Sequence, residues 1–144
     1  MIIISHRGNI IGPDKENENK PEQILKVLQL GYYVEVDVWL KENKLFLGHD
    51  FPQYETNLLF LNSSDKMICH AKNIDALEYL IKNNIHCFSH NIDDVVLTSR
   101  NWLWVYPGKK LTKNSICVLP EMVSFNIKDF DCLGICTDYI YNYF

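Results

Sequence analysis

The sequence predicts an α/β protein: a compact, reduced TIM-type (β/α) barrel, with mostly parallel strands and with shortened helices in its C-terminal half. Short aliphatic runs alternate with helical patterns, which favours parallel βαβ units. Polar residues gather directly after those runs, where a parallel barrel carries its active face. Because the chain has 144 residues and a full barrel takes about 250, the barrel is expected to be cut down.

The apolar runs give seven strand candidates, and the intervals between them decide where helices fit. The candidates are residues 2–4, 33–40, 67–69, 87–89, 102–105, 116–119 and 133–136. The first two intervals are about 30 residues each, enough for a crossover helix, whereas later ones shrink to roughly 13–19. We expect helices from Pro21 to Gly31 and from Asp75 to Asn83. A turn at 41–44 leads into a further apolar run, 45–47, and residues 51–65 are expected to form a loop with a short helical piece.

Composition narrows the class of protein. A net charge of −4 and a pI near 5.7 argue against a partner such as nucleic acid or an anionic membrane. The apolar runs are too short for stable membrane insertion, and residues 1–5 are too short for a signal-peptide core. The five cysteines form no CxxC pair, and an odd number of thiols suits a reducing cytoplasm. No linker interrupts the chain, so we expect one domain over residues 1–144, of unknown oligomeric state.

The stretch from Tyr33 to Leu40 alternates with period two. Its aliphatic residues share one face, and Glu35 and Asp37 share the other with two aromatic residues. Same-face neighbours lie about 7 Å apart along a strand, which lets two carboxylates bind one cation. The alternative is a half-exposed strand with a solvated acidic face.

Polar side chains follow several of the predicted strands. They are His6-Arg7, His49-Asp50, His70 with Lys72, His90-Asn91, Glu121 and Asp138. A single histidine at such a position is more often structural than catalytic. Four of the five histidines in these positions, beside a carboxylate pair, favour a functional site.

Three of these segments resemble the signature of the glycerophosphodiester phosphodiesterase family. They are Ser5-His6-Arg7-Gly8, Glu35-Val36-Asp37-Val38 and Gly48-His49-Asp50. The family belongs to the barrel superfamily that also holds phosphatidylinositol-specific phospholipase C. The segments 17–20 and 134–139 are similar to two further family motifs, so the chain resembles a short, divergent member.

The resemblance implies roles for individual residues. It makes His6 and His49 the general acid–base pair, and Glu35 and Asp37 the ligands of a divalent metal ion, Mg²⁺ or Ca²⁺, with Mn²⁺ as a further option. The family's third ligand is the glutamate of a Glu-x-Lys segment, and this chain has His70-Ala71-Lys72 there. The third ligand is then His70, or Glu121 if the barrel brings it round; the alternatives for His70 are a substrate contact or a polar residue at the rim. Arg7 and Lys72 are expected to bind the phosphate, and the supporting residues are Glu18, Asn19 and Asp50.

The expected function follows from the same resemblance. It is a metal-dependent phosphodiester hydrolase of lipid metabolism, located in the cytoplasm, acting on a glycerophosphodiester or a similar small phosphodiester. Whether water or a substrate hydroxyl attacks, the latter giving a cyclic phosphate, stays open. The alternative is a non-catalytic domain that binds a phosphate ligand and is derived from the same barrel.

Overall fold

The computed structural model describes residues 1–124, 126 and 131–144. Its strands all belong to one ten-stranded sheet. The strands are β1 (Ile2–His6), β2 (Tyr33–Lys41), β3 (Lys44–Leu47), β4 (Tyr54–Thr56), β5 (Met67–Ala71), β6 (Cys87–Phe88), β7 (Val95–Leu97), β8 (Leu103–Val105), β9 (Ser115–Val118) and β10 (Gly134–Thr137). The α-helices are α1 (Pro21–Gln29), α2 (Leu58–Leu61) and α3 (Ile74–Lys82), and the short 3-10 helices are η1 (Pro120–Met122) and η3 (Ile140–Tyr143).

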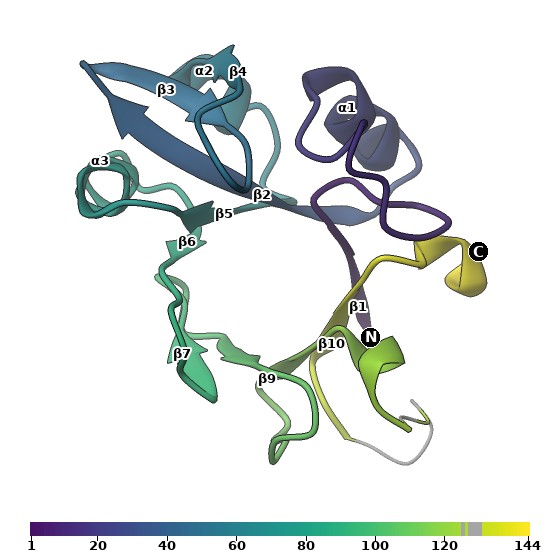
Figure 1. The fold of residues 1–144 in the computed structure, drawn as a ribbon. Helices are drawn as coiled ribbons and strands as arrows, with labels where there is room; N and C mark the ends of the chain where they lie inside the picture. The colour runs from purple at the N-terminus through teal and green to yellow at the C-terminus, as the bar shows by residue number, and fades with distance from the viewer. Residues whose placement is uncertain (125, 127–130) are drawn as a thin grey trace.

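The sheet is mixed and strongly curved, so that its strands lie around a ring (Figure 1). Six pairings are parallel and build the order β6-β5-β2-β1-β10-β9-β8. Three pairings are antiparallel: β3 pairs with β2, β4 with β3, and β7 with β8. Within the described residues no ladder joins β6 to β7 or β8, which leaves a curved half-barrel.

The predicted TIM-type barrel is therefore wrong. The chain reverses directly after β2 because Glu42 and Asn43 adopt positive φ values of 51° and 62°, a turn that matches the twist of a hairpin. The hairpin places β3 antiparallel to β2 where a barrel has a helical crossover. Between β6 and β9 the connections are too short for covering helices, and the α-helices of the described residues have nine, four and nine residues.

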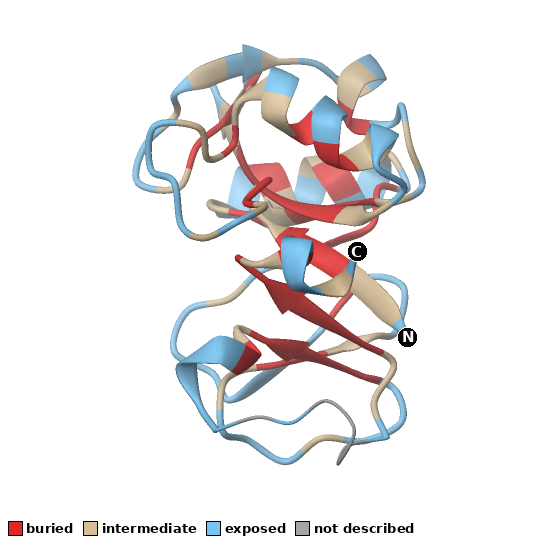
Figure 2. Ribbon diagram, turned by 90° about the vertical axis from the view of Figure 1, so that its right-hand side faces the viewer, coloured by how far each residue is buried: buried red, intermediate tan, exposed pale blue. Residues whose placement is uncertain are grey.

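Two hydrophobic clusters lie on the two faces of the curved sheet, and Figure 2 shows the buried residues concentrated on its strands. On one face Val34, Val36 and Val38 of β2 pack in the same cluster as residues of α1 and α3. The other cluster comprises Ile4, Ile68, Phe88, Trp104, Ile116, Val118 and Cys136. The period-two alternation of β2 thus buries its valines under the helices and turns its carboxylates toward the face of the second cluster.

The two longer helices follow the sequence signals for their ends. Pro21 begins α1, which buries Ile24 and Val27 and is followed by Gly31 at a φ of 90°; glycine is favoured in that left-handed conformation. The side chain of Asn73 caps α3 by accepting a hydrogen bond from the backbone N–H of Ala76. Both predicted helices are confirmed within two residues. The three-residue strands β4 and β7 were not predicted.

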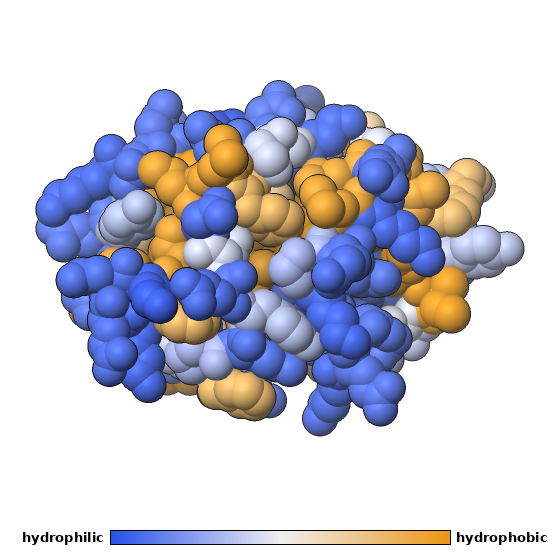
Figure 3. Space-filling view, turned by 90° about the horizontal axis from the view of Figure 1, so that it is seen from above, coloured by the Kyte–Doolittle hydropathy of each residue, from blue (hydrophilic) through white to orange (hydrophobic). Residues whose placement is uncertain are grey.

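The outer surface is not uniformly hydrophilic. Seen from above, hydrophobic patches lie between hydrophilic side chains over the elements at the top of the ring (Figure 3). Several large apolar side chains are exposed, among them Leu59 of α2 at 83% and Ile74 of α3 at 74%. In the described part of the chain, no helix is long and apolar enough to cross a membrane.

Candidate metal and phosphate site

The carboxyl ends of three neighbouring parallel strands bring the candidate residues together. The register places His6 of β1 beside Glu35 of β2. It also places Asp37 of β2 beside His70 of β5. Paired residues of adjacent parallel strands point to the same face of the sheet. Their common position therefore follows from the register and not from loop conformation.

Glu35, Asp37 and His70 form a compact cluster of three ligand-type side chains, called the carboxylate–imidazole cluster below. One ligand atom from each lies within 4.8 Å of the other two. Nδ1 of His70 is 3.1 Å from Oδ1 of Asp37 and 3.8 Å from Oε1 of Glu35. The imidazole stacks on the ring of Phe88, with a centroid distance of 4.9 Å, which holds it in this orientation.

The chemistry of the cluster fits a divalent cation. Glu35 is 2% exposed and Asp37 is fully buried, and burial of charged groups is costly unless they are paired or coordinate a metal ion. Within the described residues, Oδ1 of Asp37 is buried and receives no hydrogen bond of suitable geometry, although Nδ1 of His70 lies 3.1 Å away. Two carboxylates and one imidazole supply oxygen and nitrogen donors, a set suited to Mn²⁺ or Zn²⁺ and weaker for Mg²⁺ or Ca²⁺ than an all-oxygen set.

The two carboxylates have opposite pKa shifts. Burial and the charge of Asp37 raise the pKa of Glu35 above its usual range. Burial also acts to raise the pKa of Asp37, but His70, Arg7 and Asn19 outweigh it and lower the value to about 2. Asp37 is therefore ionised throughout the neutral pH range. A bound cation would favour the ionised form of both Glu35 and Asp37.

Asn19 fixes Asp37 from two sides. Its side-chain amide donates to Oδ2 of Asp37 at 2.9 Å, and its carbonyl oxygen accepts from the Asp37 backbone N–H at 2.9 Å. Asn19 adopts a left-handed φ of 60°, which asparagine tolerates better than most residues. Its own backbone N–H donates to the carbonyl of Arg7 at 2.9 Å. The predicted supporting residue thus ties the 9–20 loop to the cluster.

Arg7 bridges the cluster and the loop. Its backbone N–H donates to Oε2 of Glu35 at 3.2 Å, and its guanidinium lies 3.3 Å from both Oδ2 of Asp37 and Oε2 of Glu18. Nε is buried without a hydrogen-bond acceptor of suitable geometry among the described residues. Burial acts to lower the pKa of Arg7, but the three carboxylates outweigh it and raise the value. The guanidinium stays charged at any working pH, as a phosphate ligand requires.

His6 is held by an aspartate that the sequence analysis gave no role. Nδ1 of His6 lies 2.7 Å from Oδ1 of Asp138, which follows β10. The side-chain amide of Asn9 donates to the same oxygen at 2.8 Å and to Glu18 at 3.1 Å. Burial acts to lower the pKa of His6, but the hydrogen bond to Asp138 and the charge of Glu35 outweigh it and raise the value.

Only one of these two partners carried a sequence signal. Asp138 directly follows an apolar strand candidate, which marked it as polar at a strand end. Asn9 lies in a polar loop, and nothing in its local pattern singles it out. Because Asn9 is 2% exposed and bonds both Glu18 and Asp138, its importance follows from tertiary contacts alone.

His49 lies at a cavity of about 280 Å³. The cavity is lined by Arg7, Lys15, Glu18, Asn19, His49, Asp50 and Gln53. Nδ1 of His49 is 2.8 Å from Oδ1 of Asp50, and the two side chains are 38% and 80% exposed. The structure therefore joins His49 to Arg7 through a shared cavity and leaves His6 outside its lining. Lys15 and Gln53 are lining residues that the sequence analysis did not name.

The remaining candidates differ in how closely they approach the cluster. Nζ of Lys72 lies 3.8 Å from Oδ1 of Asp37, so Lys72 belongs to the site. Glu121 instead accepts hydrogen bonds from Thr137 Oγ1 at 3.0 Å and from the Asp138 backbone N–H at 2.8 Å. Both of its oxygens are thus used to hold the end of β10, and His70 is the better placed third ligand. His90 stacks on Tyr106 at 3.6 Å at the rim.

Comparisons with known proteins add no family to this description. No family model, no curated protein sequence and no solved structure matches the chain.

Proposed function

We propose that this protein is a divalent-metal-dependent phosphodiesterase acting on a small phosphodiester. The carboxylate–imidazole cluster carries the proposal: Glu35, Asp37 and His70 each place one ligand atom within 4.8 Å of the others. Arg7 and Lys72 lie against the same carboxylate, Asp37. A metal site bordered by cations suits an anionic substrate that gains negative charge in its transition state.

A divalent ion, when bound, supplies Lewis-acid stabilisation for a non-bridging phosphate oxygen. The residues around it orient the substrate and move protons. Arg7 presents a planar guanidinium that suits two oxygens of one phosphate. Lys72 adds a compact positive charge at the opposite edge of Asp37.

His6 is the proposed proton donor to the leaving alcohol. Asp138 accepts from Nδ1, so Nε2 is the ring nitrogen left for the substrate. Asp138 and Glu35 raise the pKa of His6 against the effect of burial, which favours the protonated imidazole that a proton donor requires. His49, oriented by Asp50, is the proposed base toward the attacking hydroxyl. Each role contributes roughly 10²–10⁴-fold.

The resemblance to glycerophosphodiester phosphodiesterases supports the same reaction through the motifs around His6, Glu35 and His49. A glycerophosphodiester, a place in lipid metabolism and a cytoplasmic location are parts of the proposal that rest on that resemblance. The five free thiols fit a reducing compartment.

A non-catalytic phosphate-binding domain is the second candidate. One observation favours it: the cavity beside His49 has Arg7 and Lys15 in its lining but none of the three cluster residues. A phosphate bound there would meet the cations Arg7 and Lys15, beside the carboxylates Glu18 and Asp50, without touching the metal ligands. Binding without turnover is the signature of this candidate.

The two candidates separate in one experiment. Purified protein is given a panel of small phosphodiesters with Mg²⁺, Ca²⁺ or Mn²⁺, and both product formation and equilibrium binding are measured. Metal-dependent turnover that disappears in Asp37→Asn supports the enzyme. Saturable binding with no product under any metal, unaffected by Asp37→Asn but lost in Arg7→Ala, would establish the binding domain.

A further inference from the structure

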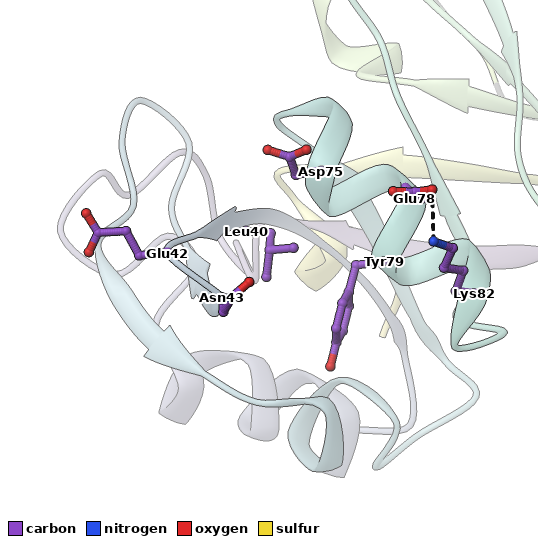
Figure 4. Close-up of a pocket in the computed structure, with 7 residues that line it drawn as sticks. All are labelled: Leu40, Glu42, Asn43, Asp75, Glu78, Tyr79 and Lys82. Atoms are coloured by element: carbon purple, nitrogen blue, oxygen red, sulfur yellow. Dashed lines mark ion pairs between the residues drawn. The ribbon is translucent and has the colours of Figure 1, made fainter.

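A groove on the far side of β2 from the carboxylate–imidazole cluster has a different composition. It lies between the turn of the β2–β3 hairpin and helix α3, and Figure 4 shows the side chains that line it. They are Leu40, Glu42, Asn43, Asp75, Glu78, Tyr79 and Lys82, around a volume of about 370 Å³. Leu40 and Tyr79 supply its apolar part, and three carboxylates stand around it.

A second hollow, of about 610 Å³, lies along the same helix. It adds Ile74, Leu77 and Ile81 to three residues that line both hollows, Asp75, Glu78 and Lys82. Ile74 is 74% exposed and Ile81 is 55% exposed. These two isoleucines are seven positions apart, so they lie on one face of α3. The exposed isoleucines form an apolar ridge, called the α3 ridge below, that lines the second hollow only, and the charged row of Asp75, Glu78 and Lys82 separates this hollow from the groove.

The charges around the groove are unequal. Glu78 is neutralised by an ion pair with Lys82, with Nζ and Oε1 2.9 Å apart. Glu42 and Asp75 form no ion pair with any described residue and are exposed. The groove thus combines a small apolar part, from Leu40 and Tyr79, with two carboxylates that lack an ion-pair partner among the described residues, one from the hairpin and one from α3.

The walls are held in place by the protein itself. The Asn73 side chain accepts from the backbone N–H of Leu40 at 3.2 Å and donates to its carbonyl at 2.8 Å. The same carbonyl oxygen of Asn73 caps α3 through the N–H of Ala76. This clamp joins the end of β2 to the start of α3, so the groove is preformed, as binding sites usually are.

We propose that the groove and the α3 ridge bind a basic amphipathic segment of another protein. Apolar side chains of that segment would cover Ile74 and Ile81 in the second hollow, and its lysines or arginines would reach Asp75 and Glu42 in the adjoining groove. This is the helix-in-groove mode of recognition, with charge complementarity at the rim. A second copy of this chain is a poor occupant, because a two-fold interface would set the same acidic patch against itself in a protein of net charge −4.

The test uses a labelled amphipathic peptide of leucine and lysine, with leucines at a spacing of about 3.6 residues. Its binding to the full chain is measured by fluorescence anisotropy, and its footprint by hydrogen exchange. We expect protection of residues 40–43 and 74–82. The double variant Ile74→Ser/Ile81→Ser should weaken binding by about tenfold or more, because the apolar area that the two isoleucines bury on binding is then missing. Glu42→Gln/Asp75→Asn should weaken binding and flatten its salt dependence.

Matched controls come from the same surface classes. Leu59→Ser removes an equally exposed apolar side chain from α2, and Glu16→Gln removes an exposed carboxylate from the 9–20 loop; both should leave the affinity unchanged. A leucine–glutamate peptide should not bind. Equal binding of that peptide, protection outside α3 and the hairpin, or no binding at all would overturn the proposal. So would self-association of the wild type that the double serine variant abolishes. If the serine variant fails to fold, the footprint on the wild type decides.

Discussion

Nδ1 of His6 lies 2.7 Å from Oδ1 of Asp138, although the two residues are 132 positions apart in the chain. The parallel pairing of β1 with β10 creates this contact, because it aligns Ser5 with Thr137 and leaves the next residue of each strand side by side. Asn9 donates to the same carboxylate oxygen, so Asp138 cannot rotate away without losing two partners. The orientation of His6 is thus set by both ends of the chain.

Asp138→Asn should lower the pKa of His6. Burial already favours the neutral imidazole, and the variant removes the negative charge and the charged acceptor that oppose it. The pKa is measured by following the His6 ring protons in an NMR pH titration, with Asp50→Asn as the control for a general effect of removing a carboxylate. Turnover, if the proposed mechanism is right, falls roughly 10²–10⁴-fold. An unchanged pKa of His6 would show that Asp138 does not tune this histidine.

His6→Ala and His49→Ala should each abolish turnover and leave metal binding largely intact, and His49→Ala should also leave the unfolding temperature unchanged. Both side chains are proposed to act on protons in one step, so the double variant should lose little more than either single variant. Rates of the four proteins are compared at saturating metal. His49 is 38% exposed, which makes a folding defect an unlikely complication for this variant. A His49→Ala rate close to that of the wild type would remove the two-histidine mechanism.

His70 should control which metal ion the cluster prefers. Replacing its imidazole by a carboxylate in His70→Glu gives an all-oxygen donor set, which should tighten Mg²⁺ or Ca²⁺ binding. His70→Ala should weaken binding of Mn²⁺ or Zn²⁺, for which the imidazole is a good donor. Calorimetric titration of the three proteins with each ion gives the affinities. Unchanged affinity in both variants would exclude His70 as a ligand.

The strand pattern was the most informative part of the sequence. The alternation from Tyr33 to Leu40 predicted that Glu35 and Asp37 share one face, and the structure places both on the inner face of β2. The side chains were expected at strand ends, and His6 and His70 lie there because of the register of β1 and β5 with β2. Local periodicity is sufficient to predict the positions of such residues, because each belongs to a strand with a clear apolar run.

The mixed, partly antiparallel sheet could not be predicted from local periodicity. The pattern of residues 45–47 is typical of a strand, but it does not show whether that strand runs parallel or antiparallel to its neighbour. The positive φ values of Glu42 and Asn43 reverse the chain, and a Glu-Asn turn is a weaker hairpin signal than Asn-Gly. The roles of Asn9 and Asp138 depend on contacts between distant segments. Such long-range contacts cannot be predicted from the local sequence pattern.

Asn19→Ala should destabilise the protein by about 2–4 kcal/mol. The variant breaks two hydrogen bonds to the buried Asp37, which contribute about 1 kcal/mol each or more where a buried group is left unpaired. It also places a Cβ-bearing residue without a local hydrogen bond at a φ of 60°. Asn19→Gly removes the side chain but relieves that conformation, so it should be the less destabilised variant in urea unfolding. A more stable Ala than Gly variant would contradict the backbone part of this account.

His86 should make the free energy of unfolding decrease as the pH falls from about 6.5 to about 4. Burial, aided by the charge of Arg100, lowers the pKa of His86 to about 4. Its side chain is enclosed, with Nε2 2.9 Å from Oγ1 of Thr98 and the ring edge-on to Trp102. Below the ordinary histidine pKa of about 6.5 the unfolded chain takes up a proton that the folded protein refuses, so the unfolded state is favoured by up to about 1.4 kcal/mol per pH unit. Below pH 4 both states are protonated and this contribution stops changing.

His86→Phe keeps an aromatic ring against Trp102 and removes the titration, and Thr98 Oγ1 still accepts from the backbone N–H of Trp102. Urea unfolding of both proteins between pH 4 and pH 8 measures the difference, in which the shared carboxylates cancel. A difference between the two proteins that does not vary with pH would show that His86 titrates normally in the folded state.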